Sequence, residues 1–137
     1  MEKHFEFTDA EFIQQLSYCT LPAALFSHEA HLRLAWIQLQ HNDVEQAIDI
    51  IRAQIQNYAA SLGAKDKYHE TITVASVKAV AFFIQKTQST TFLEFVTQNQ
   101  SLKTHFKSLL ATHYSTDIFQ SEEAKKTFLK PDLDPFE

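Results

Sequence analysis

The chain has 137 residues with a formal net charge of −5, and 45% of its residues are hydrophobic. This length is typical of one domain, and the hydrophobic fraction argues against disorder. The 12 lysines and arginines form no basic stripe, so nucleic acid is not an expected partner. The sequence contains neither a signal-peptide pattern nor an apolar stretch long enough to cross a bilayer. We therefore expect a soluble, cytoplasmic protein that forms a single domain over residues 1–137.

Glycine occurs once and proline three times, and this scarcity is the strongest indication of the fold. Tight β-hairpins usually need Asn-Gly or Asp-Gly at their turns, and the sequence contains neither pair. Helices need few such breaks. The sequence therefore predicts an all-α protein, an up-and-down helical bundle with additional short helices towards the C-terminus.

Capping residues place the expected helices along the chain, because most of them follow a side chain that can accept a hydrogen bond from the first turn. The predicted helices run over about 9–19 after Thr8, 28–41 after Ser27, from Asn42 or Asp43 to Gly63, from Asp66 to Thr87, 92–98 after Thr91, 102–113, and 122–129 after Ser121. Gly63 is the expected residue in a left-handed conformation after the third helix. Residues from about 130 to 137, with their two prolines, are expected to form an irregular tail.

Three histidines are expected to face inward at the same end of this bundle. With about 3.6 residues per turn, His28 and His31 share the apolar side of their helix, while Arg33 lies away from it. His69 shares the inward side of the fourth long helix with Thr73. Short connections favour an up-down-up arrangement, which brings the N-termini of these two helices together. The three imidazoles are then predicted to converge.

Three converging imidazoles would suit a divalent transition metal such as zinc or iron and would leave a coordination position open for water or substrate. Glu70, next to His69, is the expected general base on a metal-bound water, and Arg33 is a second catalytic candidate. The residues expected to contact substrate are Trp36, Tyr68 and Thr73. The spacing differs from H-E-x-x-H, and no E-x-x-H occurs, so a ferritin-like di-iron site is excluded.

The same residues also fit structural roles. A buried histidine is often satisfied by a backbone carbonyl. Glu29 and Arg33 stand in the i, i+4 order that favours an exposed ion pair. Trp36 fits the core as well as a pocket wall, and His4 is expected in a frayed terminus.

Three functions remain open from the sequence. The first is a small metal-dependent enzyme or metal-binding protein that uses His28, His31 and His69. The second is a metal-free domain that binds a small ligand, or regulates, through the same pocket. The third is a helical interaction module in which the histidines are structural. The sequence contains neither a G-x-S-x-G motif nor a glycine-rich phosphate loop, so we do not expect such a nucleophile or nucleotide site.

The segments F-S-H-E-A-H-L-R-L-A-W, G-A-K-D-K-Y-H-E-T-I-T and S-E-E-A-K-K-T-F-L-K-P-D-L resemble those of a small, uncharacterised bacterial family of all-helical proteins. That family carries H-x-x-H-L-R-x-A-W and K-Y-H-E-T motifs in this order, and the resemblance extends from about Leu25 to Phe136. It implies a helical fold and no particular activity. The positions that it singles out are His28, His31, Arg33, Trp36, Tyr68, His69, Glu70 and Thr71.

The apolar stripe of the third helix is expected to face the core. The residues expected to be buried around it are Leu39, Ile51, Ile55 and Val80. Truncating Ile55 to alanine should then cost about 2–5 kcal/mol.

Overall fold

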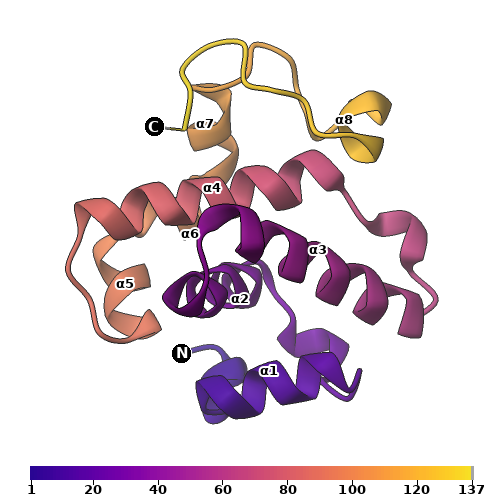
Figure 1. Ribbon diagram of the computed structural model, residues 1–137, viewed down its shortest axis with the longest axis vertical. Helices are drawn as coiled ribbons and strands as arrows, with labels where there is room; N and C mark the ends of the chain where they lie inside the picture. The colour runs from indigo at the N-terminus through magenta and orange to yellow at the C-terminus, as the bar shows by residue number, and fades with distance from the viewer. Residues whose placement is uncertain (137) are drawn as a thin grey trace.

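The computed structural model describes residues 1–136, which form helices and irregular connections with no strand among them (Figure 1). This confirms the predicted all-α bundle with short C-terminal helices. Glu137, the end of the predicted irregular tail, lies outside the described residues. The 3-10 helices are η1 (Lys3–Glu6), η2 (Ala23–Leu25) and η3 (Lys65–Lys67). The α-helices are α1 (Asp9–Ser17), α2 (His28–His41), α3 (Val44–Ser61), α4 (Glu70–Lys86), α5 (Phe92–Gln98), α6 (Ser101–Thr104), α7 (Phe106–Ala111) and α8 (Glu122–Lys126).

Side-chain caps begin five of these helices where the sequence predicts. The side chains that accept the first-turn hydrogen bonds are those of Thr8, Ser27, Asp43, Thr91 and Ser121. Gly63 follows α3 with a φ of 67°, the left-handed conformation that glycine adopts without strain. The chain also enters this conformation at Cys19, with a φ of 59°, and α1 therefore ends two residues earlier than predicted.

The predicted start of α4 is wrong. Asp66 lies in η3, and α4 begins at Glu70 after His69. The ring of His69 takes over the capping role, because its Nδ1 accepts the backbone N–H of Ile72 at 3.1 Å. Histidine is not among the residues usually favoured at this position, so the sequence pattern pointed to the aspartate instead.

Two C-terminal helices are also shorter than predicted. The expected helix over 102–113 is divided at His105, whose φ of −131° and ψ of 36° leave the helical region. The last helix ends at Lys126 because a distant residue binds the backbone that follows. Thr71 on α4 donates from Oγ1 to the Thr127 carbonyl at 2.8 Å and accepts the Leu129 N–H at 3.0 Å.

The core lies where α2, α3 and α4 pack together, with α1 beyond α3, α5 and α6 against α2, and α7 and α8 on the other side of α4 (Figure 1). α3 and α4 run antiparallel, as the short connection between them favours. Ile51 and Val80 are buried as predicted, whereas Leu39 and Ile55 are half-buried. Within the described residues, no helix is both long and apolar enough to cross a membrane.

A second, smaller cluster lies between α4 and the C-terminal segments. Its buried members are Ala75, Phe106, Leu110, Tyr114, Ile118 and Ala124. α4 therefore contributes to two cores, one on each side. This explains why its sequence is apolar almost all round and why its start, T-I-T-V, resembles a strand pattern.

Candidate functional site

A cavity of about 290 Å³ opens where the first halves of α2 and α4 meet the middle of α3. The first halves of α2 and α4 thus border one cavity, as the sequence predicts. Aliphatic side chains form most of the wall. The polar residues of the wall are His28, His31, Thr73 and Ser76. Two of the three predicted histidines thus share one cavity with a predicted contact residue.

His31 is held in this cavity by a hydrogen bond and an aromatic contact. Its Nδ1 donates to the Ser27 carbonyl at 2.8 Å, and its ring stacks on Phe26 with the centroids 3.8 Å apart. Phe26 in turn packs edge-on against Tyr58, whose hydroxyl donates to the Leu21 carbonyl at 2.6 Å. Burial lowers the pKa of His31, although the bond to the Ser27 carbonyl opposes this. The ring is therefore neutral at pH 7, with a lone pair on Nε2.

The other polar groups of the cavity donate hydrogen bonds to backbone carbonyls. His28 donates from Nε2 to the Leu102 carbonyl at 2.9 Å. Thr73 donates to the His69 carbonyl at 2.7 Å, and Ser76 donates to the Ile72 carbonyl at 2.6 Å. A hydroxyl that has donated its hydrogen still accepts through its lone pairs. The cavity therefore offers hydrogen-bond acceptors set into an apolar wall.

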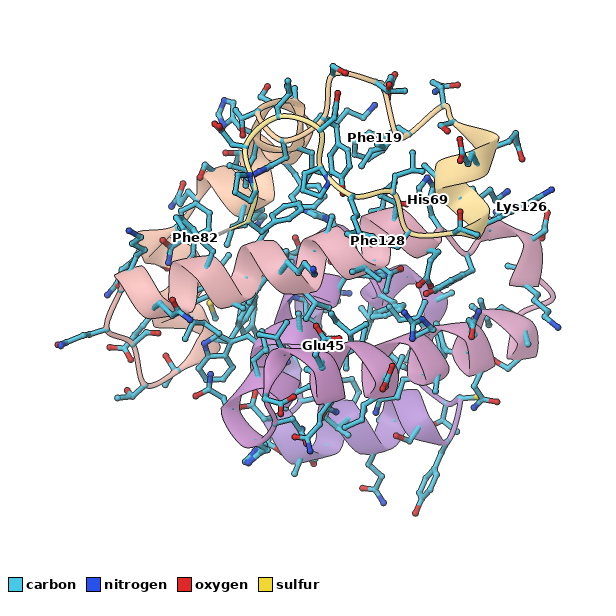
Figure 2. All side chains as sticks on the ribbon, turned by 45° about the horizontal axis from the view of Figure 1, so that its top comes forward. Glu45, His69, Phe82, Phe119, Lys126 and Phe128 are labelled. Atoms are coloured by element: carbon cyan, nitrogen blue, oxygen red, sulfur yellow. The ribbon has the colours of Figure 1, made fainter. Side chains whose placement is uncertain are left out.

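His69 does not line this cavity. It points towards the C-terminal segments of the chain, and Figure 2 shows it beside α8. Its Nε2 donates to the Ile118 carbonyl at 2.8 Å, while Nδ1 caps α4. Both ring nitrogens are thus occupied, and the lone pair that a metal would need is already used. The predicted inward orientation of His69 is wrong because the residue precedes α4 rather than lying in its first turn.

The three imidazoles do not form a metal-binding group. Among residues 1–136, the group of three potential ligands whose atoms all lie within 4.8 Å of one another is Glu2, His4 and Glu29. His28, His31 and His69 instead bind three different carbonyls. The predicted zinc or iron site on these three residues is therefore not assembled in the structure.

The group around His4 is a structural network rather than a metal site. Arg33 donates to Nδ1 of His4 at 3.3 Å, so the ring hydrogen must lie on Nε2, which donates to Glu29 at 2.7 Å. A protonated ring nitrogen cannot ligate a metal. The other oxygen of Glu29 lies 2.7 Å from the Lys103 ammonium, and Glu2 accepts from Ser27. Every member already has a partner.

His4 and Arg33 also correct two sequence predictions. His4 is fully buried rather than frayed, and Arg33 and Glu29 are only 4% and 5% exposed, so they form no exposed pair. Arg33 donates to the carbonyls of His4 at 2.7 Å and Phe7 at 2.8 Å, and it pairs with Asp9 at 2.9 Å. It fastens the N-terminal segment onto α2 and lies away from the cavity, so it has no catalytic position there.

Glu70 is held by a group that the sequence did not reveal. Arg52 on α3 donates to its carboxylate at 3.0 Å and 2.7 Å, and the Tyr68 hydroxyl donates at 2.6 Å. Burial alone would raise the pKa of Glu70, but these hydrogen bonds outweigh it and hold the pKa below its usual value. An ionised carboxylate with its oxygens engaged in this way is a poor general base.

Tyr68 and Trp36, the remaining predicted contact residues, do not line the cavity. Burial raises the pKa of Tyr68, and its hydrogen bond to Glu70 adds to this, so its hydroxyl stays protonated as a donor. Trp36 is 4% exposed and packs in the core, with its ring centroid 6.1 Å from that of Phe92. Of the predicted site residues, the structure thus brings together His28, His31 and Thr73, and Ser76 joins them.

The two buried histidines predict how stability depends on pH. Burial lowers the pKa of His4, despite its Glu29 partner, and it lowers that of His31. Below pH 6.5 the unfolded chain therefore binds more protons than the folded one, and the free energy of unfolding should fall as the pH decreases. Urea unfolding at about pH 7.5 and about pH 5.5 measures this above the range in which carboxylates titrate.

The matched variants for this pH measurement are His4→Gln and the control His41→Gln, an exposed position at the end of α2. His4→Gln should reduce the loss of stability between the two pH values, even if it destabilises the protein at both. His41→Gln should leave the loss unchanged. A protein equally stable at both pH values would contradict the burial of His4 and His31 as neutral rings.

Comparisons with models of protein families, with curated proteins and with solved structures found no match to this chain. The resemblance to a bacterial helical family therefore stays a prediction from the motifs.

Proposed function

We propose that the protein binds a small molecule, without a metal, in the cavity between α2, α3 and α4. The single observation that supports this most directly is the unpartnered ring nitrogen of His31. This residue is a neutral imidazole whose Nδ1–H is committed to the Ser27 carbonyl, while Nε2 has no partner among the described residues. Among residues 1–136, every buried side-chain nitrogen or oxygen has a hydrogen-bond partner. Because Nε2 of His31 has no such partner, this atom is not fully buried and is accessible. The accessible space beside the ring is the cavity that it lines.

The chemistry of the wall defines the class of ligand. His31, Thr73 and Ser76 present acceptors, because their hydrogens are bound to backbone carbonyls. A ligand that supplies N–H or O–H donors would satisfy them, whereas a carboxylate would face acceptors and lose its hydration. The aliphatic wall would take up an apolar body. A volume of about 290 Å³ is at the small end of ligand cavities, so the body has few carbons.

Three probes with the same branched body and different head groups test this proposal. They are isopentylamine, isopentanol and isovalerate, which offer a cationic donor, a neutral donor and an acceptor-only anion at neutral pH. Titrations followed by nuclear magnetic resonance, read at the ring signals of His31, should detect binding of the first two and not of isovalerate. His31→Phe keeps the stacking on Phe26 but removes the acceptor, and it should weaken binding about tenfold.

The matched control is His105→Phe, an exposed histidine between α6 and α7, which should leave all affinities unchanged. Circular dichroism checks that both variants keep their helix content. Equal binding of the three probes, or binding that His31→Phe does not weaken, would refute the proposal. Titration with Zn²⁺ is a separate arm. Tight binding that is lost in His31→Phe would assign the cavity to a metal instead.

A further inference from the structure

A second concave site lies on the far side of α4, between that helix, the start of α3 and the C-terminal tail. This groove has a volume of about 670 Å³. Figure 2 labels three residues that line it, Phe82 on α4, Phe128 after α8 and Glu45 at the start of α3. Phe136 and two prolines complete an apolar floor. None of the residues discussed for the cavity around His31 contributes to this groove.

Three lysines surround this apolar floor. Lys78 and Lys86 lie along α4, and Lys130 begins the tail. The Lys78 ammonium lies 5.1 Å from the centroid of the Phe128 ring, and that of Lys86 lies 5.1 Å from the centroid of Phe82. Within residues 1–136 none of the three forms an ion pair with a carboxylate. Among the described lining residues, these three lysines face one carboxylate, that of Glu45. The groove therefore carries a local positive charge, although the net charge of the chain is −5.

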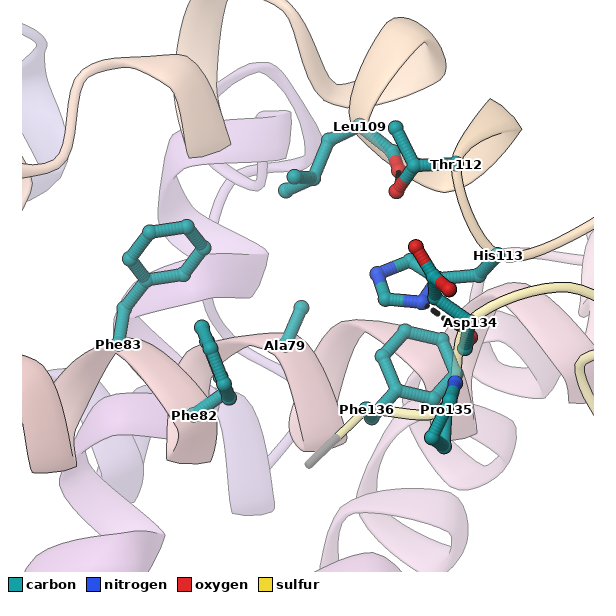
Figure 3. Close-up of a pocket in the computed structure, with 9 residues that line it drawn as sticks. All are labelled: Ala79, Phe82, Phe83, Leu109, Thr112, His113, Asp134, Pro135 and Phe136. Atoms are coloured by element: carbon teal, nitrogen blue, oxygen red, sulfur yellow. Dashed lines mark hydrogen bonds between the residues drawn. The ribbon is translucent and has the colours of Figure 1, made fainter.

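Phe82 also borders a second hollow, of about 340 Å³, on the other side of the tail (Figure 3). Pro135 and Phe136 line both spaces, and Phe83 and Leu109 extend the apolar wall. His113 stacks on Phe136, with the ring centroids 4.1 Å apart, and donates from Nδ1 to the Asp134 carbonyl at 2.7 Å. These contacts hold the tail in place over α4, so the apolar floor continues beneath it.

We propose that this groove binds an anionic amphiphile, a molecule with one alkyl chain and a carboxylate head. The alkyl chain lies on the phenylalanine floor, and the carboxylate head meets the ammonium group of Lys78 or of Lys86, which lie about two turns apart on α4. The ammonium groups of Lys78 and Lys86 already lie over aromatic rings, so these charges are positioned beside the groove at little further cost in side-chain entropy. The proposal is independent of the function assigned to the cavity around His31.

The shape of the groove favours a small molecule over a macromolecule. Its walls come from three separate segments, the start of α3, the second half of α4 and the tail, which enclose it on several sides. Its volume is in the range of small-molecule sites. A flat face for a partner protein, or a membrane surface, would not need walls of this kind.

Binding of three ten-carbon probes to the intact chain tests the proposal. Decanoate, decanol and decyltrimethylammonium share one alkyl chain and differ in head charge, and each is used at a concentration where it is monomeric. Isothermal titration calorimetry should give an affinity for decanoate about tenfold higher than for decanol, and lowest for the cation. Added salt should reduce the preference for decanoate, because the lysines are at the solvent-facing rim.

Two variants locate the site. Lys78→Gln/Lys86→Gln should abolish the preference for decanoate over decanol, while Lys65→Gln/Lys67→Gln makes the same charge change on η3 and should preserve it. Ala81→Leu adds bulk inside the groove and should weaken decanoate and decanol alike. Ala81 lies on the half-buried outer face of α4, so this variant should keep its fold, which circular dichroism verifies.

Four results would overturn the proposal. Equal affinities for decanoate and decanol would remove the role of the lysines. Unchanged binding in Ala81→Leu would place the probe elsewhere. Binding to phosphatidylglycerol vesicles without binding to monomeric decanoate would assign the groove to a membrane surface. Self-association that Ala81→Leu abolishes would assign it to a second copy of the chain.

Discussion

Replacing Arg33 by methionine is expected to lower the free energy of unfolding by about 3–5 kcal/mol, as for a buried ionic network that loses one partner. Methionine fills much of the same volume but donates no hydrogen bond. The carbonyls of His4 and Phe7 would then lose the donors that now bind them at 2.7 Å and 2.8 Å. Because the segment that carries them covers α2, water reaches these carbonyls only if the N-terminal segment detaches. Urea unfolding at neutral pH measures the loss.

The control for this prediction is Asp9→Asn. It removes the charge that pairs with Arg33 but leaves both carbonyl contacts in place. Asp9 is half exposed, so its ion pair is screened by solvent, and its loss should cost less than about 1 kcal/mol. Similar losses for Arg33→Met and Asp9→Asn would mean that the ion pair, and not the capture of backbone carbonyls, is what Arg33 contributes.

The helices that the sequence predicted correctly are those set by neighbours in the chain. The capping box of Thr8 with Glu11, the cap at Ser27 and the left-handed glycine after α3 are local features, and each lies where the pattern placed it. The predicted boundaries failed where a distant group intervened. Thr71, more than fifty residues away along the chain, binds the backbone after α8 and ends that helix early.

The candidate site was predicted in part for the same reason. Helical periodicity correctly placed His31 and Thr73 towards a shared space, because both lie inside regular helices. His69 failed because one residue decides whether it belongs to the first turn or to the cap. Nothing in the local sequence links Arg52 to Glu70, or Glu29 to His4, and these pairs determine which carboxylates are free for chemistry.

The K-Y-H-E-T segment shows how a dense motif can serve structure. Tyr68 and Glu70 turn towards Arg52 on α3, whereas His69 and Thr71 turn towards the C-terminal segments. The alternation fastens the start of α4 to both of its neighbours. The polar residues of this motif are therefore explained by their contacts on the two sides of α4. The polar residues that remain in the candidate ligand cavity are His28, His31, Thr73 and Ser76.

Truncating Ile51 to alanine is expected to lower the free energy of unfolding by about 2–5 kcal/mol, because the side chain is buried where α2, α3 and α4 meet. Ile55, one turn further along α3, is the matched control. It is half-buried and already borders the cavity, so its truncation should cost only about 1–2 kcal/mol, less than the stripe alone suggested.

The two truncations should also differ in their effect on ligand binding. Ile55→Ala enlarges the cavity while the protein remains stable, so the affinity should shift from isopentanol towards an alcohol with a larger apolar body, such as cyclohexylmethanol. Urea unfolding gives the two stabilities, and titration of each alcohol gives the selectivity. If Ile55→Ala proved as destabilising as Ile51→Ala and left the selectivity unchanged, the space beside Ile55 would be packed core rather than a ligand cavity.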